Sequence, residues 1–153
     1  MSIVWQYLDK KSAAVKVLKD YSSMKYIVDN TKEEINNIHD DMGSISSPSF
    51  DDMPKAYNPK ANEERIIKGI DAIDVLKERY RQAIEYMNWF KPAWEELTDD
   101  EQYVLTEFYI NDDEGQTSAV YNICDYFSIE RSSAYNKKNR ALEHLTVLLY
   151  GRS

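Results

Sequence analysis

The amino-acid sequence predicts an all-α protein, and three observations lead to that fold class. Apolar residues recur at helical spacing along most of the 153 residues. Long β-branched alternation, the pattern of a half-buried strand, is missing. Gly and Pro are few, with four residues each, so few turns interrupt the helices. We therefore expect a long antiparallel, coiled-coil-like helical hairpin over residues 1–93 and a smaller helical head over residues 94–153.

The composition favours a folded protein of the cytoplasm. Hydrophobic residues make up 42% of the chain and charged residues 30%. Cys124 is the single cysteine, so no internal disulfide can form and a reducing, cytoplasmic compartment is expected. The segment Met1–Leu8 lacks the apolar region of a secretory signal. No segment approaches the ~20 apolar residues of a membrane-spanning helix, so no membrane partner is expected.

The first long helix follows a heptad pattern that begins at Ala14. Four heptads favour a coiled-coil seam over the face of a globular helix, and Ser12 is the expected N-cap. A helix of this length extends about 45 Å at 1.5 Å per residue. Among the seam positions only Thr31 is clearly polar: Ala14, Val17, Tyr21, Met24, Val28, Thr31, Ile35, Ile38 and Met42.

Residues 43–61 interrupt the pattern, and their Gly, Pro and Ser content predicts a loop. The second long helix is expected to start near Pro59 and to stop at Pro92, because proline costs ~3 kcal/mol in a helix interior. Two long helices joined by one loop most simply fold back on each other. We expect this hairpin to form a homodimer or to act as a docking rod. Its apolar stripe is Ile66, Ile70, Ile73, Leu76, Tyr80, Ala83, Ile84, Met87 and Phe90.

The head begins with a capping box, in which Thr98 is the N-cap and Glu101 the reciprocal partner. An acidic turn over Asn111–Thr117 precedes a short helix at Ser118–Phe127. Phe127-Ser-Ile129 is too short for a loop and predicts a tight turn, with Ile129 anchored on the core. A longer helix follows from about Ser132 to Leu149, capped by Ser132 or Glu130. Its expected buried stripe is Ala134, Ala141, Leu142, Leu145, Leu148 and Leu149.

The opposite face of this last helix carries bases and amides. Residues Glu130–Ser153 hold five basic and two acidic side chains, a net charge of +3, although the whole chain carries −8. A helix of roughly 10–12 Å diameter fits the major groove of DNA. Arg and Lys there can grip phosphate or guanine, and Asn can pair with adenine. The predicted DNA-binding residues are Arg131, Ser132, Ser133, Asn136, Lys137 and Arg140. Lys138 lies nearer the buried stripe and is ambiguous.

Four stretches of the head resemble region 4 of the bacterial sigma-70 family, a helix-turn-helix domain. They are Leu97–Tyr109, Val120–Ile129, Ser132–Tyr135 and Arg140–Leu145. Family members usually have Ala, Leu and Gly where this chain has Cys124, Phe127 and Ser128. The last difference predicts a slightly altered turn, because that position often needs φ > 0. The resemblance implies that Ser118–Phe127 supports a recognition helix, that a promoter element similar to the −35 element is read, and that RNA polymerase is a partner.

Two interpretations of function remain open. The N-terminal half looks like phage and prophage regulators of the ArpU and RinA type, which favours a transcription regulator that binds double-stranded DNA. The alternative is an adaptor that binds RNA polymerase or another protein without touching DNA. Its interface would be the surface of Thr98–Ile129, which has eight acidic residues and no Lys or Arg.

Enzyme chemistry is not expected from this sequence. No phosphate-cradling glycine loop is present, so neither catalytic residues nor a cofactor are predicted. His39 and His144 are far apart and neither has a second ligand at helical spacing, so no metal site is predicted. Cys124 lies on the expected buried face of its helix, where an inert core thiol is the natural interpretation.

Overall fold

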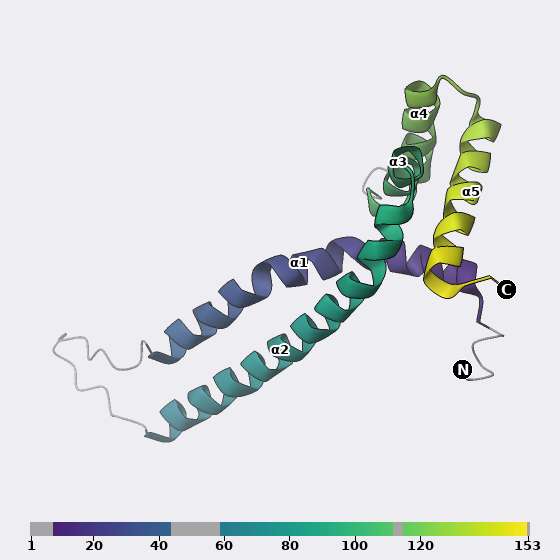
Figure 1. The fold of residues 1–153 in the computed structure, drawn as a ribbon. Helices are drawn as coiled ribbons and strands as arrows, with labels where there is room; N and C mark the ends of the chain where they lie inside the picture. The colour runs from purple at the N-terminus through teal and green to yellow at the C-terminus, as the bar shows by residue number, and fades with distance from the viewer. Residues whose placement is uncertain (1–7, 44–58, 112–114, 153) are drawn as a thin grey trace. The chain divides into compact units, whose positions relative to one another are not determined.

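The computed structural model describes residues 8–43, 59–111 and 115–152, and this part of the chain is helical with no strand (Figure 1). The predicted all-α class is thereby confirmed for the described residues. No helix among them combines the length and apolar character needed to cross a membrane. The elements are α1 (Lys10–Gly43), α2 (Pro59–Glu96), α3 (Asp99–Leu105), the π-helix η3 (Thr106–Ile110), α4 (Gly115–Phe127) and α5 (Arg131–Tyr150).

The chain forms two compact units that do not coincide with the predicted ranges 1–93 and 94–153. Unit 1 comprises Met1–Met24 and Tyr86–Ser153, and unit 2 comprises Lys25–Glu85. The start of α1 and the end of α2 therefore belong to the same unit as α3, α4 and α5. Most of the predicted loop 43–61 lies outside the described residues, and its last three positions are already part of α2.

The core of unit 1 combines residues from every helix of that unit. Phe90 is its aromatic centre, with ring centroids of Tyr21, Tyr86 and Trp94 5.5–5.6 Å away. The Tyr86 hydroxyl donates to the Val17 carbonyl at 2.5 Å, which satisfies a polar group inside this apolar region. The buried cluster is Ala14, Leu18, Phe90, Ala93, Leu97, Val104, Leu105, Phe108, Tyr109, Ala119, Val120, Ile123, Ala134, Ala141, Leu142, Leu145 and Leu149.

Two expectations about helix ends were wrong. The Asp9 carboxylate, not Ser12, caps α1, because it accepts from the Ser12 amide at 3.1 Å and from its hydroxyl at 2.8 Å. These bonds hold the pKa of Asp9 below its ordinary value.

The second wrong expectation concerns α2. Pro92 does not end this helix, which continues to Glu96. Pro92 has no backbone N–H, so the carbonyl of Asn88 receives no helical hydrogen bond. Both residues are exposed, whereas Ala93 is buried. Solvent can therefore replace the missing bond.

The short helix α3 starts as predicted and then widens. The Thr98 hydroxyl accepts from the Glu101 amide at 3.2 Å, and the Glu101 carboxylate accepts from the Thr98 amide at 3.1 Å, so the capping box is confirmed. The following turn is a π-helix, closed by a bond from the Asn111 amide to the Thr106 carbonyl. Both Phe108 and Tyr109 are buried there.

In unit 2 the end of α1 lies against the start of α2. Arg65 donates to the Asp41 carbonyl at 2.6 Å, and a side chain at Gly69 would collide with Met42. Thr31, the polar seam position, is buried and its hydroxyl donates to the Ile27 carbonyl at 2.5 Å.

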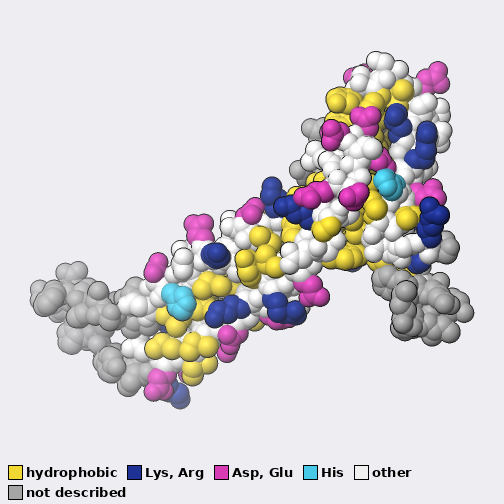
Figure 2. Space-filling view, viewed as in Figure 1, with side chains coloured by type: hydrophobic (Ala, Val, Ile, Leu, Met, Phe, Trp, Pro, Cys, Tyr) yellow, Lys and Arg dark blue, Asp and Glu magenta, His cyan; other side chains and the backbone are white. Residues whose placement is uncertain are grey.

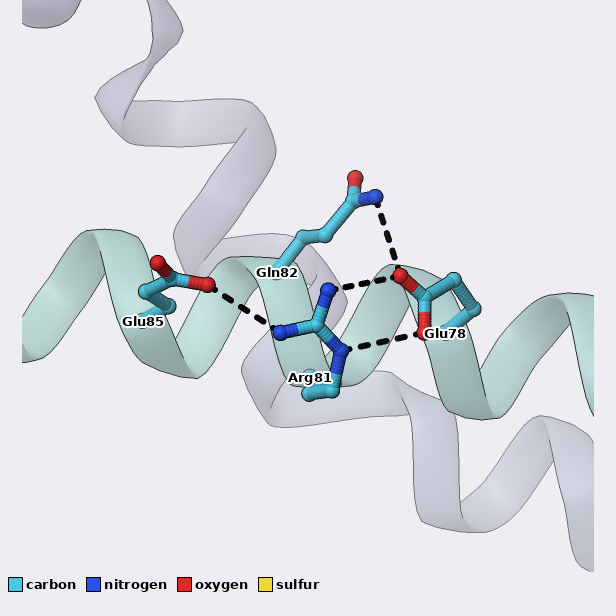
Figure 3. A network of polar contacts seen from close by, with 4 residues as sticks. All are labelled: Glu78, Arg81, Gln82 and Glu85. Atoms are coloured by element: carbon cyan, nitrogen blue, oxygen red, sulfur yellow. Dashed lines mark hydrogen bonds and ion pairs between the residues drawn. The ribbon is translucent and has the colours of Figure 1, made fainter.

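A charged network lies on α2. Arg81 forms two bonds to Glu78 (3.0 and 2.7 Å) and one to Glu85 (3.2 Å) (Figure 3). Gln82 also donates to Glu78 at 3.2 Å, so this charged group is satisfied within its own helix.

Candidate nucleic-acid interface

The turn between α4 and α5 consists of Ser128, Ile129 and Glu130. Ser128 itself adopts the left-handed conformation, with φ of 54°, although it stands where glycine was expected. The Ile129 amide donates to the Cys124 carbonyl at 3.1 Å, and the half-buried Ile129 side chain packs on the core. The turn therefore has the apolar anchor that the sequence suggested, and Ser128 takes the left-handed conformation although a serine was expected to alter the turn. The helix α4 starts at Gly115 rather than Ser118, and part of the expected acidic turn lies outside the described residues.

The start of α5 differs from the prediction in its cap. Glu130 occupies the N-cap position in an extended conformation, but no side chain forms a capping bond there. Ser132 lies inside the first turn and is exposed. The first bond of the helix joins the Ala134 amide to the Glu130 carbonyl at 3.0 Å. Water, or a ligand, must therefore satisfy the preceding amides of the first turn.

A buried stripe fixes the orientation of α5. Ala134, Ala141, Leu142, Leu145 and Leu149 are buried, and Leu148 is half-buried against the same core. The apolar stripe predicted from spacing is thus the face that packs inward. Because these positions follow the helical period and lie on one side of α5, the opposite side of the helix faces outward.

The predicted DNA-binding residues lie at or beside this outward face. Ser132, Asn136 and Arg140, four residues apart, form one exposed row, and Arg131 is exposed at the helix start; Ser133 and Lys137 are half-buried. Among the described residues, neither Arg131 nor Arg140 forms an ion pair. Figure 2 shows Lys and Arg side chains, in dark blue, in the region of α5, whereas α4 contains neither residue.

Asn139 was missed as a site candidate. It is exposed on α5 beside the row of Ser132, Asn136 and Arg140. Its position three residues after Asn136 places it on the same side of a helix. The spacing rule that selected Asn136 could therefore have found it, and α5 presents two neighbouring amides.

The two lysines of α5 lie over aromatic rings. The ammonium of Lys137 is 4.5 Å from the ring centroid of Phe127, the last residue of α4. The ammonium of Lys138 is 5.1 Å from the Phe108 ring and 5.3 Å from the Tyr135 ring. Burial, and next the charge of Lys11, lowers the pKa of Lys138. Such cation–π contacts hold each ammonium close to the helix, so Lys137 presents its charge near the turn and Lys138 acts mainly in packing.

An aromatic cluster and a shallow hollow lie next to the turn. Tyr103 of α3 stacks on Tyr126 of α4 with centroids 4.2 Å apart, and both rings contact Phe127. The hollow has a volume of about 520 Å³ and is lined by Thr117, Val120, Tyr121, Cys124, Asp125, Ile129, Glu130 and Arg131. Cys124 packs against the core, as expected for a core thiol, but it is only half-buried because it also lines this hollow.

A polar contact between His144 and Glu101 joins α5 to the capping box of α3. The Nδ1 atom of His144 lies 2.7 Å from the Glu101 carboxylate. Burial alone would raise the pKa of Glu101, but the bonds from Thr98 and the contact with His144 outweigh it and lower that pKa. His144 therefore has a structural partner. No group of three side chains able to hold a metal ion occurs in the described ranges.

Comparisons with known proteins return no match. No protein-family model, no curated protein and no solved structure matches the chain. The inference about function therefore depends on the geometry of α4, the turn and α5.

Proposed function

We propose that this protein is a DNA-binding transcription regulator that reads double-stranded DNA with α5. One observation supports it above the others. Arg131 and Arg140, which have no ion-pair partner among the described residues, lie on a helix whose opposite face is fixed in the core. From Arg131 to Glu143 the chain contains four bases before its first acid. Unpaired guanidinium groups on a rigid helix suit phosphate and guanine recognition.

Each exposed residue has a chemical role in this proposal. Asn136 and Arg140 are four residues, or about 6 Å, apart along the helix axis, which is within two base-pair steps. Asn136 would pair with adenine, and Arg140 would bind guanine or phosphate. Ser132, Ser133 and Arg131 would hold the helix start on the backbone, where the uncapped amides also favour an anion.

The resemblance to sigma region 4 extends the proposal to a promoter element and to RNA polymerase as a partner. The phage-regulator resemblance favours activation of late genes. A homodimer would supply a second recognition helix, and such pairing raises the affinity of a chain whose net charge of −8 gives little long-range attraction to DNA.

The test begins with selection of bound duplexes from a random pool, followed by titration at several salt concentrations. The affinity should fall with salt on a log–log plot. Arg140→Ala should either remove about 0.9 from that slope, for one phosphate contact, or cost about 1–3 kcal/mol at one base position. Arg79→Ala is the matched control, because Arg79 is an exposed arginine of unit 2. Equal losses for the two variants would contradict the proposal.

An adaptor without DNA contact is the second candidate, and the surface of α4 favours it. Tyr121 and Tyr126 are 71% and 63% exposed on either side of the exposed Asp125. Exposed tyrosines are enriched at protein interfaces. Tyr121→Ala should weaken capture of RNA polymerase in that case. Absence of salt-dependent binding to every selected duplex would favour the adaptor.

A further inference from the structure

The first turns of α2 in unit 2 leave large apolar side chains exposed. Ile66, Ile67 and Ile70 are 40%, 57% and 48% exposed, whereas Ile73 and Leu76, which follow, are buried. Figure 2 shows hydrophobic side chains gathered between the end of α1 and the start of α2. Ile38 and Met42 of α1 are only half-buried. Two helices alone therefore do not cover the apolar surface of this part of unit 2.

The exposed apolar residues lie on a stripe that begins with the acid Glu63 and ends with the acid Asp74 and the base Lys77. Glu63, Ile66, Ile70 and Lys77 follow one another at spacings of three, four and seven residues, which keeps them on one side of α2. Both charged residues are exposed, and neither forms an ion pair among the described residues. Arg81, farther along α2, is already held by Glu78 and Glu85 (Figure 3).

The stripe is complementary to itself. Glu63 lies seven residues before Ile70 and Lys77 lies seven residues after it. A two-fold axis through Ile70 therefore places Glu63 of one copy opposite Lys77 of the other, twice, and brings the two Ile70 side chains together. The same axis sets the exposed Asp74 opposite Ile66, where its carboxylate must stay at the rim of the contact. Two-fold contacts between identical surfaces need this symmetry. A parallel pairing would instead place glutamate against glutamate and lysine against lysine.

We propose that a second copy of this chain packs on this stripe, with the two α2 helices antiparallel about Ile70. The pairing covers Ile66, Ile67 and Ile70 and forms two reciprocal Glu63–Lys77 contacts. The partner is the same chain because its stripe supplies both the apolar surface and the opposite charges in the required order. This inference does not depend on DNA binding, because the stripe belongs to unit 2 and the proposed DNA-binding residues belong to unit 1.

Charge reversal tests the pairing directly, with mass measured by analytical ultracentrifugation over a range of concentrations. The wild-type protein should reach twice the 18.0 kDa of one chain. Glu63→Lys and Lys77→Glu should each raise the dimer dissociation constant, and the double variant should restore it. Ile70→Glu should raise it by at least about tenfold. Val75→Glu is the control at a position that is 60% exposed away from the stripe and should change it little.

Crosslinking locates the axis. In a Cys124→Ser background, Ile70→Cys should form a disulfide between two copies, and Val75→Cys should not. A mass of one chain at every concentration would overturn the proposal, and so would equal crosslinking at both positions. A dimer that tolerates Ile70→Glu, or single reversals that the double variant does not rescue, would also overturn it. Circular dichroism of each variant shows that the helices remain folded.

Discussion

The contact between the α3 capping box and α5 gives the most detailed prediction. In Glu101→Ala the Thr98 amide loses the acceptor at 3.1 Å, and His144 loses the carboxylate at 2.7 Å. The bond from the residue 101 amide to the Thr98 hydroxyl survives, because it uses the backbone. The substitution therefore removes half of the capping box and the whole link to α5.

The expected loss of stability follows from these two contacts. Half of a capping box is worth about 1 kcal/mol. The His144 side chain is 43% exposed, so its contact with Glu101 adds only about 0.5 kcal/mol after solvent screening. Together they predict a loss of about 1.5 kcal/mol, which lowers the Tm of a unit of the size of unit 1 by about 6–12 °C.

Tryptophan fluorescence during thermal unfolding is the appropriate assay. Lys25–Glu85, which forms unit 2, contains no tryptophan, so the signal reports on unit 1 alone. Asp100→Ala is the matched control, because Asp100 is an exposed acid in the same first turn of α3. It shares any interaction with the helix dipole but forms no capping bond.

The pH dependence has a definite sign. The pKa of Glu101 is lowered from its ordinary value of 4.5, so its contribution is present above that value and disappears as pH falls through the lower folded pKa. The difference between wild type and Glu101→Ala should be constant near neutral pH and shrink below pH 4.5. If Glu101→Ala is no more destabilising than Asp100→Ala, or if the difference grows in acid, the account of this contact is wrong.

Three further substitutions test the packing of unit 1 by the same fluorescence assay. Leu145→Ala should cost about 2–5 kcal/mol, because Leu145 is fully buried in the core; a loss below 1 kcal/mol would show that α5 is oriented differently. Ser128→Gly should gain about 0.5 kcal/mol, because φ of 54° strains serine more than glycine; destabilisation would refute that turn. Pro92→Ala should gain about 1–2 kcal/mol, since α2 continues through this position; no gain would place a helix end there.

Local patterns in the sequence were sufficient for the capping box and for the inward face of α5. Both depend on contacts within a few residues, which spacing alone determines. The stripe from Ala134 to Leu149 is buried as predicted. The exposed row of Ser132, Asn136 and Arg140 follows from the same spacing.

Long-range packing could not be predicted in the same way. Ala14 and Leu18 of α1 are fully buried in the core with Phe90 of α2 and the head helices. The heptad pattern indicates only which side of α1 is apolar. It does not indicate that the first turns of α1 pack in the same core as α3, α4 and α5. The same limitation explains Pro92, whose tolerance depends on which side of α2 faces solvent.

The outward side of α5 was predictable from the sequence, but the contacts of its side chains were not. Helical spacing selected the exposed cations, yet it could not show that Lys137 lies over Phe127 or that Lys138 lies over Phe108. Those contacts join residues of different helices. The missing side-chain cap at Glu130 is also a property of the folded turn, since both Glu130 and Ser132 had suitable chemistry.

The half-buried thiol at the turn has a practical consequence. Cys124 is the chain's single cysteine, and it lines the same hollow as Arg131, the first residue of α5. A thiol-reactive fluorophore or spin label attached to the unmodified sequence would therefore sit at one defined position, at the hollow that Arg131 also lines. Its emission or mobility would report the arrival of a duplex or a protein at this end of α5 without any engineered mutation.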